Sequence, residues 1–176
     1  MKIGIIGSGR VGYSMGKYMQ DHGIRVTGFY DRHRERALDA AQFTGTDSFD
    51  RIEDLVAASD TLFLTTSDGE IANVWDCIRH LSIQGKIICH FSGSLSSDQF
   101  QGIEKTRAYG LSIHPMLAFS DKYTSYKQLQ NAFFTIEGHA QALAVMEPLL
   151  QKMGNPVQRI APEQKALYHA AAATLS

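Results

Sequence analysis

Residues 2–12 read Lys-Ile-Gly-Ile-Ile-Gly-Ser-Gly-Arg-Val-Gly, and this stretch decides the fold. Its short apolar run is typical of a buried parallel strand. The run leads directly into a motif with the spacing G-x-G-x-x-G, Gly7-Ser8-Gly9-Arg10-Val11-Gly12. The first glycine allows a tight turn, the second leaves room for a pyrophosphate, and the third lets the next helix pack closely on the sheet. Free N–H groups at the start of that helix favour phosphates. The stretch therefore predicts a dinucleotide-binding site.

Composition limits the classes of function. The chain has 176 residues, of which 44% are hydrophobic and 20% charged, as in an ordinary globular protein with a buried core. A net charge of −1 gives no reason to expect binding to nucleic acid or to an anionic membrane surface. No stretch approaches the length of a transmembrane helix, and the first residues lack the features of a signal peptide. We therefore expect a cytoplasmic protein with a small-molecule substrate. The two cysteines fit no metal-binding spacing, so no metal site is expected.

Strands alternate with helices along the rest of the chain. We expect further strands at residues 25–30, 46–49, 61–65, 86–90, 108–113, 132–136 and 157–160. We expect helices at residues 11–20, 33–42, 52–57, 69–80, 97–104 and 139–153, and a longer polar loop at residues 115–131. This alternation predicts an α/β fold with a doubly wound, mostly parallel sheet.

The last stretch has a different character. Pro162 stands where a helix would begin, and residues 163–176 favour helix to the final residue without a glycine stop. We therefore expect residues 1–161 to form the dinucleotide-binding domain. Residues 162–176 would form the first helix of a helical C-terminal domain that is truncated in this chain.

Asp31 ends the second predicted strand, near the distance from the glycine motif at which an acidic side chain binds the adenosine ribose. A carboxylate there favours NAD over NADP, because it repels a 2′-phosphate. Arg32 and Arg34 follow, and either guanidinium could hold such a phosphate instead, so NADP stays open. The alternative is that these charges are solvated groups at a helix start.

Small polar side chains follow the strand predicted at residues 61–65. Ligands of open α/β sheets bind beyond the carboxyl ends of the strands. We therefore expect Thr65, Thr66 and Ser67 to line the middle and the nicotinamide half of a bound cofactor. Helix capping by Ser67 or Asp68 is a second interpretation, and it is compatible with the first.

The next two strands end at the same rim. Ser92, Gly93 and Ser94 follow residues 86–90, and their hydroxyl and backbone donors suit a substrate carboxylate or carbonyl. His114 follows residues 108–113 and could orient the substrate or transfer a proton. The alternatives are a turn that caps the next helix and a histidine satisfied by the backbone.

Lys165 and His169 lie four residues apart in the last predicted helix and share one face of it. A desolvated lysine beside a carbonyl oxygen is a plausible proton donor for hydride reduction. The alternative is that Lys165 is a solvated surface group.

These blocks together resemble a family of predicted oxidoreductases with a Rossmann-like N-terminal domain and a C-terminal domain of unknown function. The resemblance spans essentially all 176 residues, and its more specific blocks are His90-Phe-Ser-Gly-Ser94, Ile113-His-Pro-Met116 and Lys165-Ala-Leu-Tyr-His-Ala170. The wider group is similar to pyrroline-5-carboxylate reductase, β-hydroxyacid dehydrogenases and ketopantoate reductase. In the β-hydroxyacid dehydrogenases a helical lysine transfers the proton, with an asparagine or histidine one turn later, and Lys165 and His169 match that spacing. Asp31 departs from many NADP-using relatives, which have a neutral residue there.

The resemblance implies an NAD(P)-dependent oxidoreductase that reduces a small carbonyl or imine acid, with a ketopantoate-like 2-oxo acid as one candidate. It also implies a homodimer formed through the C-terminal helical domain. A non-catalytic dinucleotide-binding or sensing protein is the alternative function. A different nucleotide ligand on the same fold is a weaker alternative, because a fold does not fix a function.

Overall fold

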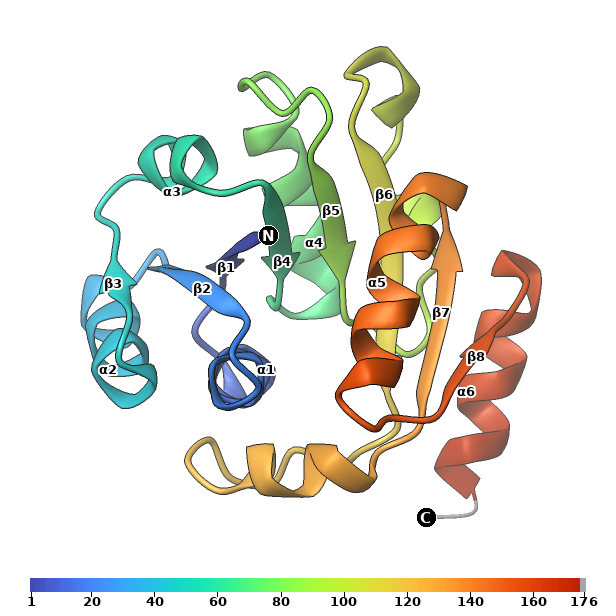
Figure 1. Cartoon of the computed structure of the whole chain (residues 1–176). Coiled ribbons are helices and arrows are strands. Elements are labelled where there is room, and N and C mark those ends of the chain that lie inside the picture. The colour runs from blue at the N-terminus through green and yellow to red at the C-terminus, as the bar shows by residue number, and fades with distance from the viewer. Residues whose placement is uncertain (175–176) are drawn as a thin grey trace.

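The computed structural model describes the backbone of residues 1–174 and the side chains of residues 1–170. Its centre is one sheet with the strand order β3-β2-β1-β4-β5-β6-β7-β8 (Figure 1). Neighbouring strands are parallel except for β6 and β7, which are antiparallel. The strands are β1 (Lys2–Ile6), β2 (Arg25–Tyr30), β3 (Asp47–Ser48), β4 (Thr61–Leu64), β5 (Ile87–His90), β6 (Tyr109–Pro115), β7 (Phe134–Gly138) and β8 (Val157–Arg159). The predicted doubly wound, mostly parallel sheet is confirmed.

Helices cover both faces of this sheet. The α-helices are α1 (Arg10–Asp21), α2 (Arg34–Thr44), α3 (Ile52–Ala58), α4 (Asp68–Ile78), α5 (Ala140–Lys152) and α6 (Lys165–Thr174). The short 3-10 helices are η1 (Ser97–Gln99), η2 (Ile103–Lys105), η3 (Ser125–Asn131) and η4 (Pro162–Gln164). No helix in the described part of the chain is long and apolar enough to cross a membrane.

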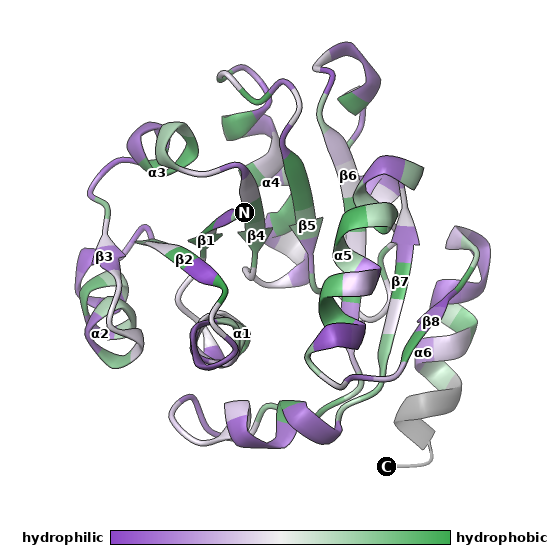
Figure 2. Ribbon diagram, viewed as in Figure 1, coloured by the Kyte–Doolittle hydropathy of each residue, from purple (hydrophilic) through white to green (hydrophobic). Residues whose placement is uncertain are grey.

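Two apolar clusters hold the layers together. One joins α1, α2 and α5 to one face of the sheet, and the other joins α3, α4 and the η1–η2 region to the opposite face. Burial of apolar surface on both faces is the main stabilising contribution in such a fold. The strands are accordingly apolar over most of their length, as Figure 2 shows for β1 and β5.

The prediction of a helix at residues 97–104 is wrong. The segment forms the two short turns η1 and η2, because Gly102 between them has the left-handed φ of 73° and cannot continue a right-handed helix. Phe100 turns inward instead and packs edge-on against Trp75, with ring centroids 5.4 Å apart. The β5–β6 connection therefore contains two short 3-10 turns and no α-helix.

The predicted loop at residues 115–131 also differs from the structure. Strand β6 continues through Pro115, so His114 lies inside the strand, and residues 125–131 form η3. The connection packs against α1 before the chain returns as the antiparallel strand β7 (Figure 1).

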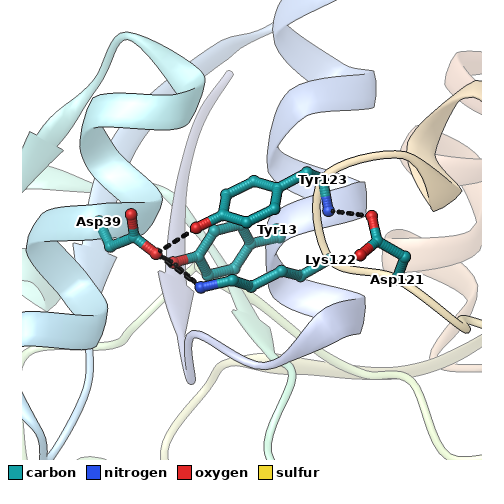
Figure 3. Close-up of polar contacts among 5 residues, drawn as sticks. All are labelled: Tyr13, Asp39, Asp121, Lys122 and Tyr123. Carbon is teal, nitrogen blue, oxygen red and sulfur yellow. Dashed lines mark hydrogen bonds and ion pairs between the residues drawn. The ribbon is translucent and has the colours of Figure 1, made fainter.

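A polar cluster fastens this connection to α1 and α2 (Figure 3). The Lys122 ammonium and the Tyr123 hydroxyl donate to Asp39 Oδ2, at 2.7 and 2.9 Å, and the Tyr13 hydroxyl donates to the same oxygen. The Lys122 ammonium also lies over both tyrosine rings, 4.8 and 4.6 Å from their centroids. These donors, Lys122 above all, lower the pKa of Asp39 to about 2. We call this group the Asp39 cluster.

Candidate functional site

The glycine motif forms the turn between β1 and α1. Gly7 has a φ of 104°, and its N–H donates to the carbonyl of Tyr30 at 2.8 Å. A Cβ on Gly12 would lie 2.3 Å from the carbonyl oxygen of Gly7, so the helix can approach the turn this closely only without a side chain. A Cβ on Gly9 would meet nothing nearer than 3.8 Å. Gly7 and Gly12 are thus required by the packing of the protein, whereas Gly9 leaves open space.

That space belongs to a cleft of about 420 Å³ at the carboxyl ends of β1, β2 and β4. Its walls include most of the predicted cofactor residues, namely Gly7, Ser8, Gly9, Asp31, Arg32, Thr65, Thr66 and Ser67. The start of α1 points its N–H groups here, without a capping side chain or an acidic residue in the first turn. The buried hydroxyls of Ser8 and Thr66 have no hydrogen-bond partner among the described residues. The cleft therefore offers unused donors to an anionic ligand.

Three residues of the glycine motif do not line the cleft. Arg10 extends toward the β6–β7 connection, where its guanidinium donates to the carbonyl of Phe119 at 3.5 Å. Val11 packs against the apolar core, and Gly12 is buried below the turn. Thr65 does line the cleft, but its hydroxyl donates to the carbonyl of Gly7 at 2.6 Å. This hydrogen bond from Thr65 therefore stabilises the turn.

The end of the cleft beside β2 combines one carboxylate with two guanidinium groups. Asp31 accepts hydrogen bonds from the backbone N–H of Ser8 at 2.7 Å and of His33 at 2.9 Å. Arg32 lines the cleft as predicted, but Arg34 turns away and pairs with Asp50 at 2.7 Å. Arg36 lines the cleft in its place. Arg36 was not among the predicted cofactor residues, because Arg32 precedes α2 and no helical spacing connects the two arginines.

A second group of polar residues follows β4 and β5. Ser92 donates its hydroxyl to Asp68 at 2.8 Å and accepts from the N–H of Leu95 at 2.9 Å. The Ser94 hydroxyl donates to the same Asp68 oxygen at 3.2 Å. Ser67 stands at the N-cap of α4 without a side-chain capping bond. The two serine hydroxyls thus hold the Asp68 carboxylate, a contact that the sequence analysis did not predict.

The lack of a side chain at Gly93 leaves room for the rings of His114 and His169, both predicted site residues. A Cβ there would lie 2.3 Å from His169 Nδ1 and 2.9 Å from His114 Nε2. The rings of His114 and His169 are 5.3 Å apart between centroids, and neither Nδ1 has a hydrogen-bond partner among the described residues. Burial, followed by the nearby charge of Lys165, lowers the pKa of His114 to about 4, so His114 is neutral near pH 7. Because His114 Nδ1 has no hydrogen-bond partner among these residues, the alternative of a histidine satisfied by backbone hydrogen bonds is excluded.

Lys165 is a buried cation at the first position of α6. Its side chain is 1% exposed, and its ammonium has no hydrogen-bond partner among the described residues. This excludes the interpretation as a solvated surface group. Burial lowers the pKa of Lys165 to about 8, against the opposing effect of the carboxylates of Glu137 and Asp68. Lys165 can therefore exchange a proton near neutral pH.

Comparison with known proteins agrees with the fold. Residues 1–82 match the family model described as "Oxidoreductase family, NAD-binding Rossmann fold". This part of the chain therefore resembles the NAD-binding domain of an oxidoreductase family. Residues 132–176 match a domain of unknown function, so the predicted succession of a Rossmann domain and a domain of unknown function is confirmed. The search of curated proteins gives no match.

Solved structures share the Rossmann fold at low identity. A putative NADP oxidoreductase from Bacteroides fragilis has a TM-score of 0.86 and 20% identity over 99% of this chain and 66% of its own. An imine reductase from Pseudomonas sp. has a TM-score of 0.77 and 20% identity over 99% of this chain and 60% of its own. Prephenate dehydrogenase from A. aeolicus, solved with NAD+, has a TM-score of 0.78 and 14% identity over 94% of this chain and 61% of its own. This chain thus spans less than two thirds of each protein.

Proposed function

We propose that this chain belongs to an NAD(P)-dependent oxidoreductase that transfers hydride between the nicotinamide and a small carbonyl or imine acid. The observation that carries the proposal is the buried ammonium of Lys165, which has no hydrogen-bond partner among the described residues and is close enough to His114 for its charge to affect that ring. A lysine that is desolvated and lacks a partner suits a proton donor better than a structural ion pair.

The fit to a dinucleotide rests on this chain's own residues. Gly9 leaves room for a pyrophosphate, the start of α1 supplies N–H donors, and the Ser8 and Thr66 hydroxyls are free to donate. Asp31 lines the cleft and would accept hydrogen bonds from the ribose hydroxyls. The bound nicotinamide would supply the hydride.

We propose that the substrate oxygen or imine nitrogen binds near Gly93, where Lys165 and His114 each have a polar atom without a hydrogen-bond partner among the described residues. Lys165 would donate the proton as the hydride arrives, and the neutral His114 would orient the substrate by a hydrogen bond. Positioning and electrostatic stabilisation would provide the rate enhancement, without a covalent intermediate. The sequence predicts that Ser92 and Ser94 hold a substrate carboxylate or carbonyl. Because both hydroxyls donate to Asp68, we assign them an indirect role in this site.

Two guanidinium groups at the cleft bear on the choice between NAD and NADP. Within the described residues, neither Arg32 nor Arg36 has an ion pair, whereas Arg34 has one. We propose that Arg32 and Arg36 can hold a 2′-phosphate and that Asp31 binds ribose hydroxyls when NAD is the cofactor.

The test is a panel of small 2-oxo acids, including ketopantoate, and cyclic imines, followed by the loss of NADH or NADPH absorbance. We expect turnover of at least one compound by the wild-type chain and a fall of roughly 10²- to 10⁴-fold in kcat for Lys165→Ala. Lys152→Ala, which removes a lysine from the end of α5, is the control. Equal turnover by Lys165→Ala and wild type would remove Lys165 from the mechanism. Cofactor binding without any turnover would favour the sensing protein. The homodimer, the cytoplasmic location and the domain boundary after residue 161 stay predictions.

A further inference from the structure

One face of the sheet becomes polar near Lys165. His90 of β5 is paired in register with Ser112 of β6, which is paired in turn with Glu137 of β7. Residues opposite each other in a sheet point to the same face, and so does His114, two residues beyond Ser112. The opposite face of these strands is apolar and is covered by α5. The polar row is fully enclosed in the protein, since His90, Ser112 and Glu137 are all buried.

Glu137 is a fixed carboxylate in this row. It is 2% exposed and accepts two hydrogen bonds from Ser97, one from the backbone N–H and one from the hydroxyl, both at 2.7 Å. Ser97 is the first residue of η1, so these two bonds tie the β5–β6 connection to β7. Burial raises the pKa of Glu137, and the charge of Lys165 opposes that effect.

Asp68 is a second fixed carboxylate on the cofactor side of the same site. Ser92 and Ser94 hold it from the two sides of Gly93, the residue that contacts His114 and His169. Both carboxylates are therefore oriented by serine donors. His169, one turn along α6 from Lys165, lies against Gly93 and His114, so the face of α6 that carries Lys165 packs over this polar group. Among the described residues neither carboxylate forms an ion pair with Lys165, and the charges of both oppose the lowering of its pKa by burial. The charged and titratable groups around Lys165 are Glu137 on β7, Asp68 on α4, His90 on β5, His114 on β6 and His169 on α6.

We propose that Asp68 and Glu137 are the positioning residues of Lys165, two serine-held carboxylates that keep a charged ammonium in an otherwise desolvated site. Without them, burial alone would favour the neutral amine and would leave the site without its proton at neutral pH. The Ser92-Gly93-Ser94 turn then acts on the reaction through Asp68. This inference rests on the proposed function for its catalytic meaning.

The experiment measures the titration of Lys165 directly, on the full chain without cofactor or substrate. Lysine labelled with a carbon isotope at Cε reports the charge of each amine by NMR, and Lys165→Arg identifies the signal of Lys165. We expect a midpoint near pH 8 in the wild type. We expect the midpoint to fall by about one pH unit in Asp68→Asn and in Glu137→Gln, as loss of a nearby opposite charge requires. Asp76→Asn removes the same charge from the far end of α4 and should leave the midpoint unchanged.

An unchanged midpoint in folded Asp68→Asn and Glu137→Gln variants would overturn the proposal. Asp68 is exposed, so its variant decides the matter if Glu137→Gln fails to fold. The result is independent of turnover. Shifted midpoints in a chain that reduces no substrate would refute only the proposed function. Turnover that depends on Lys165 with unshifted midpoints would refute only the role of the two carboxylates.

Discussion

At the scale of single residues, the glycines of the motif have separable roles. A methyl group on Gly12 would collide with the carbonyl of Gly7, whereas a methyl group on Gly9 would enter open space. We therefore expect Gly12→Ala to lose about 1–3 kcal/mol of unfolding free energy, as an overpacked site does. Gly9→Ala should unfold at nearly the wild-type temperature. Thermal unfolding followed by circular dichroism compares the two. A Gly12→Ala chain as stable as Gly9→Ala would contradict this division.

The pKa of Lys165 predicts how the rate of reduction depends on pH. A proton donor must be protonated, and the pKa of Lys165 is about 8, so kcat/KM for reduction should be constant below that pH and fall as the pH rises through it. His114 should not contribute a second transition near neutral pH, because its pKa is about 4. A pH profile of reduction measures this. A rate that rises above pH 8 would exclude Lys165 as the acid.

The positions of Arg36 and Asp31 in the cleft predict how NADH and NADPH are distinguished. Arg36→Ala should weaken the binding of NADPH more than that of NADH, and Asp31→Ala should do the reverse, because only NADPH carries the 2′-phosphate. Arg34→Ala is the matched control, since its guanidinium pairs with Asp50 outside the cleft. The dissociation constants come from the quenching of protein fluorescence. Equal losses for both cofactors in Arg36→Ala would show that Arg36 does not meet the phosphate.

At the scale of elements, the Asp39 cluster joins the β6–β7 connection to α1 and α2. The pKa of Asp39 is about 2 in the folded chain, below the ordinary value for aspartate, so its contribution to stability is complete above about pH 4 and is lost as the pH falls toward 2. Because Asp39 is partly exposed, we expect Asp39→Asn to cost only about 1 kcal/mol at neutral pH. The difference from wild type should shrink at acid pH in urea unfolding. A difference that grows there would contradict this account.

The elements that sequence predicts well are those with a local signal. The β1–α1 unit and the helices α2 and α4 follow from apolar periodicity and glycine turns, and their predicted positions agree with the structure within three residues. The prediction of a helix at residues 97–104 fails because the left-handed Gly102 and the burial of Phe100 decide the conformation of that segment. The antiparallel pairing of β7 depends on the path of residues 116–133, which has no local signature.

At the scale of the whole molecule, the sequence predicts which residues meet at the rim but not how they pair. Parallel strands bring their carboxyl ends to one edge, so Thr65, Ser92 and His114 were expected there. The bonds between Ser92 and Asp68, and between Ser97 and Glu137, join residues 24 and 40 positions apart and depend on side-chain directions that no local pattern specifies. For the same reason Arg36, and not Arg34, enters the cleft.

The central claim is that the cleft beside the glycine motif binds a nicotinamide dinucleotide. Calorimetric titration of NADH and NADPH into the wild-type chain and into Gly9→Val tests it most directly. We predict saturable binding of at least one cofactor by the wild type, and no measurable binding by a folded Gly9→Val chain, because the valine side chain fills the pyrophosphate space. Equal binding by the two chains, or no binding of either cofactor to the wild type, would contradict the account.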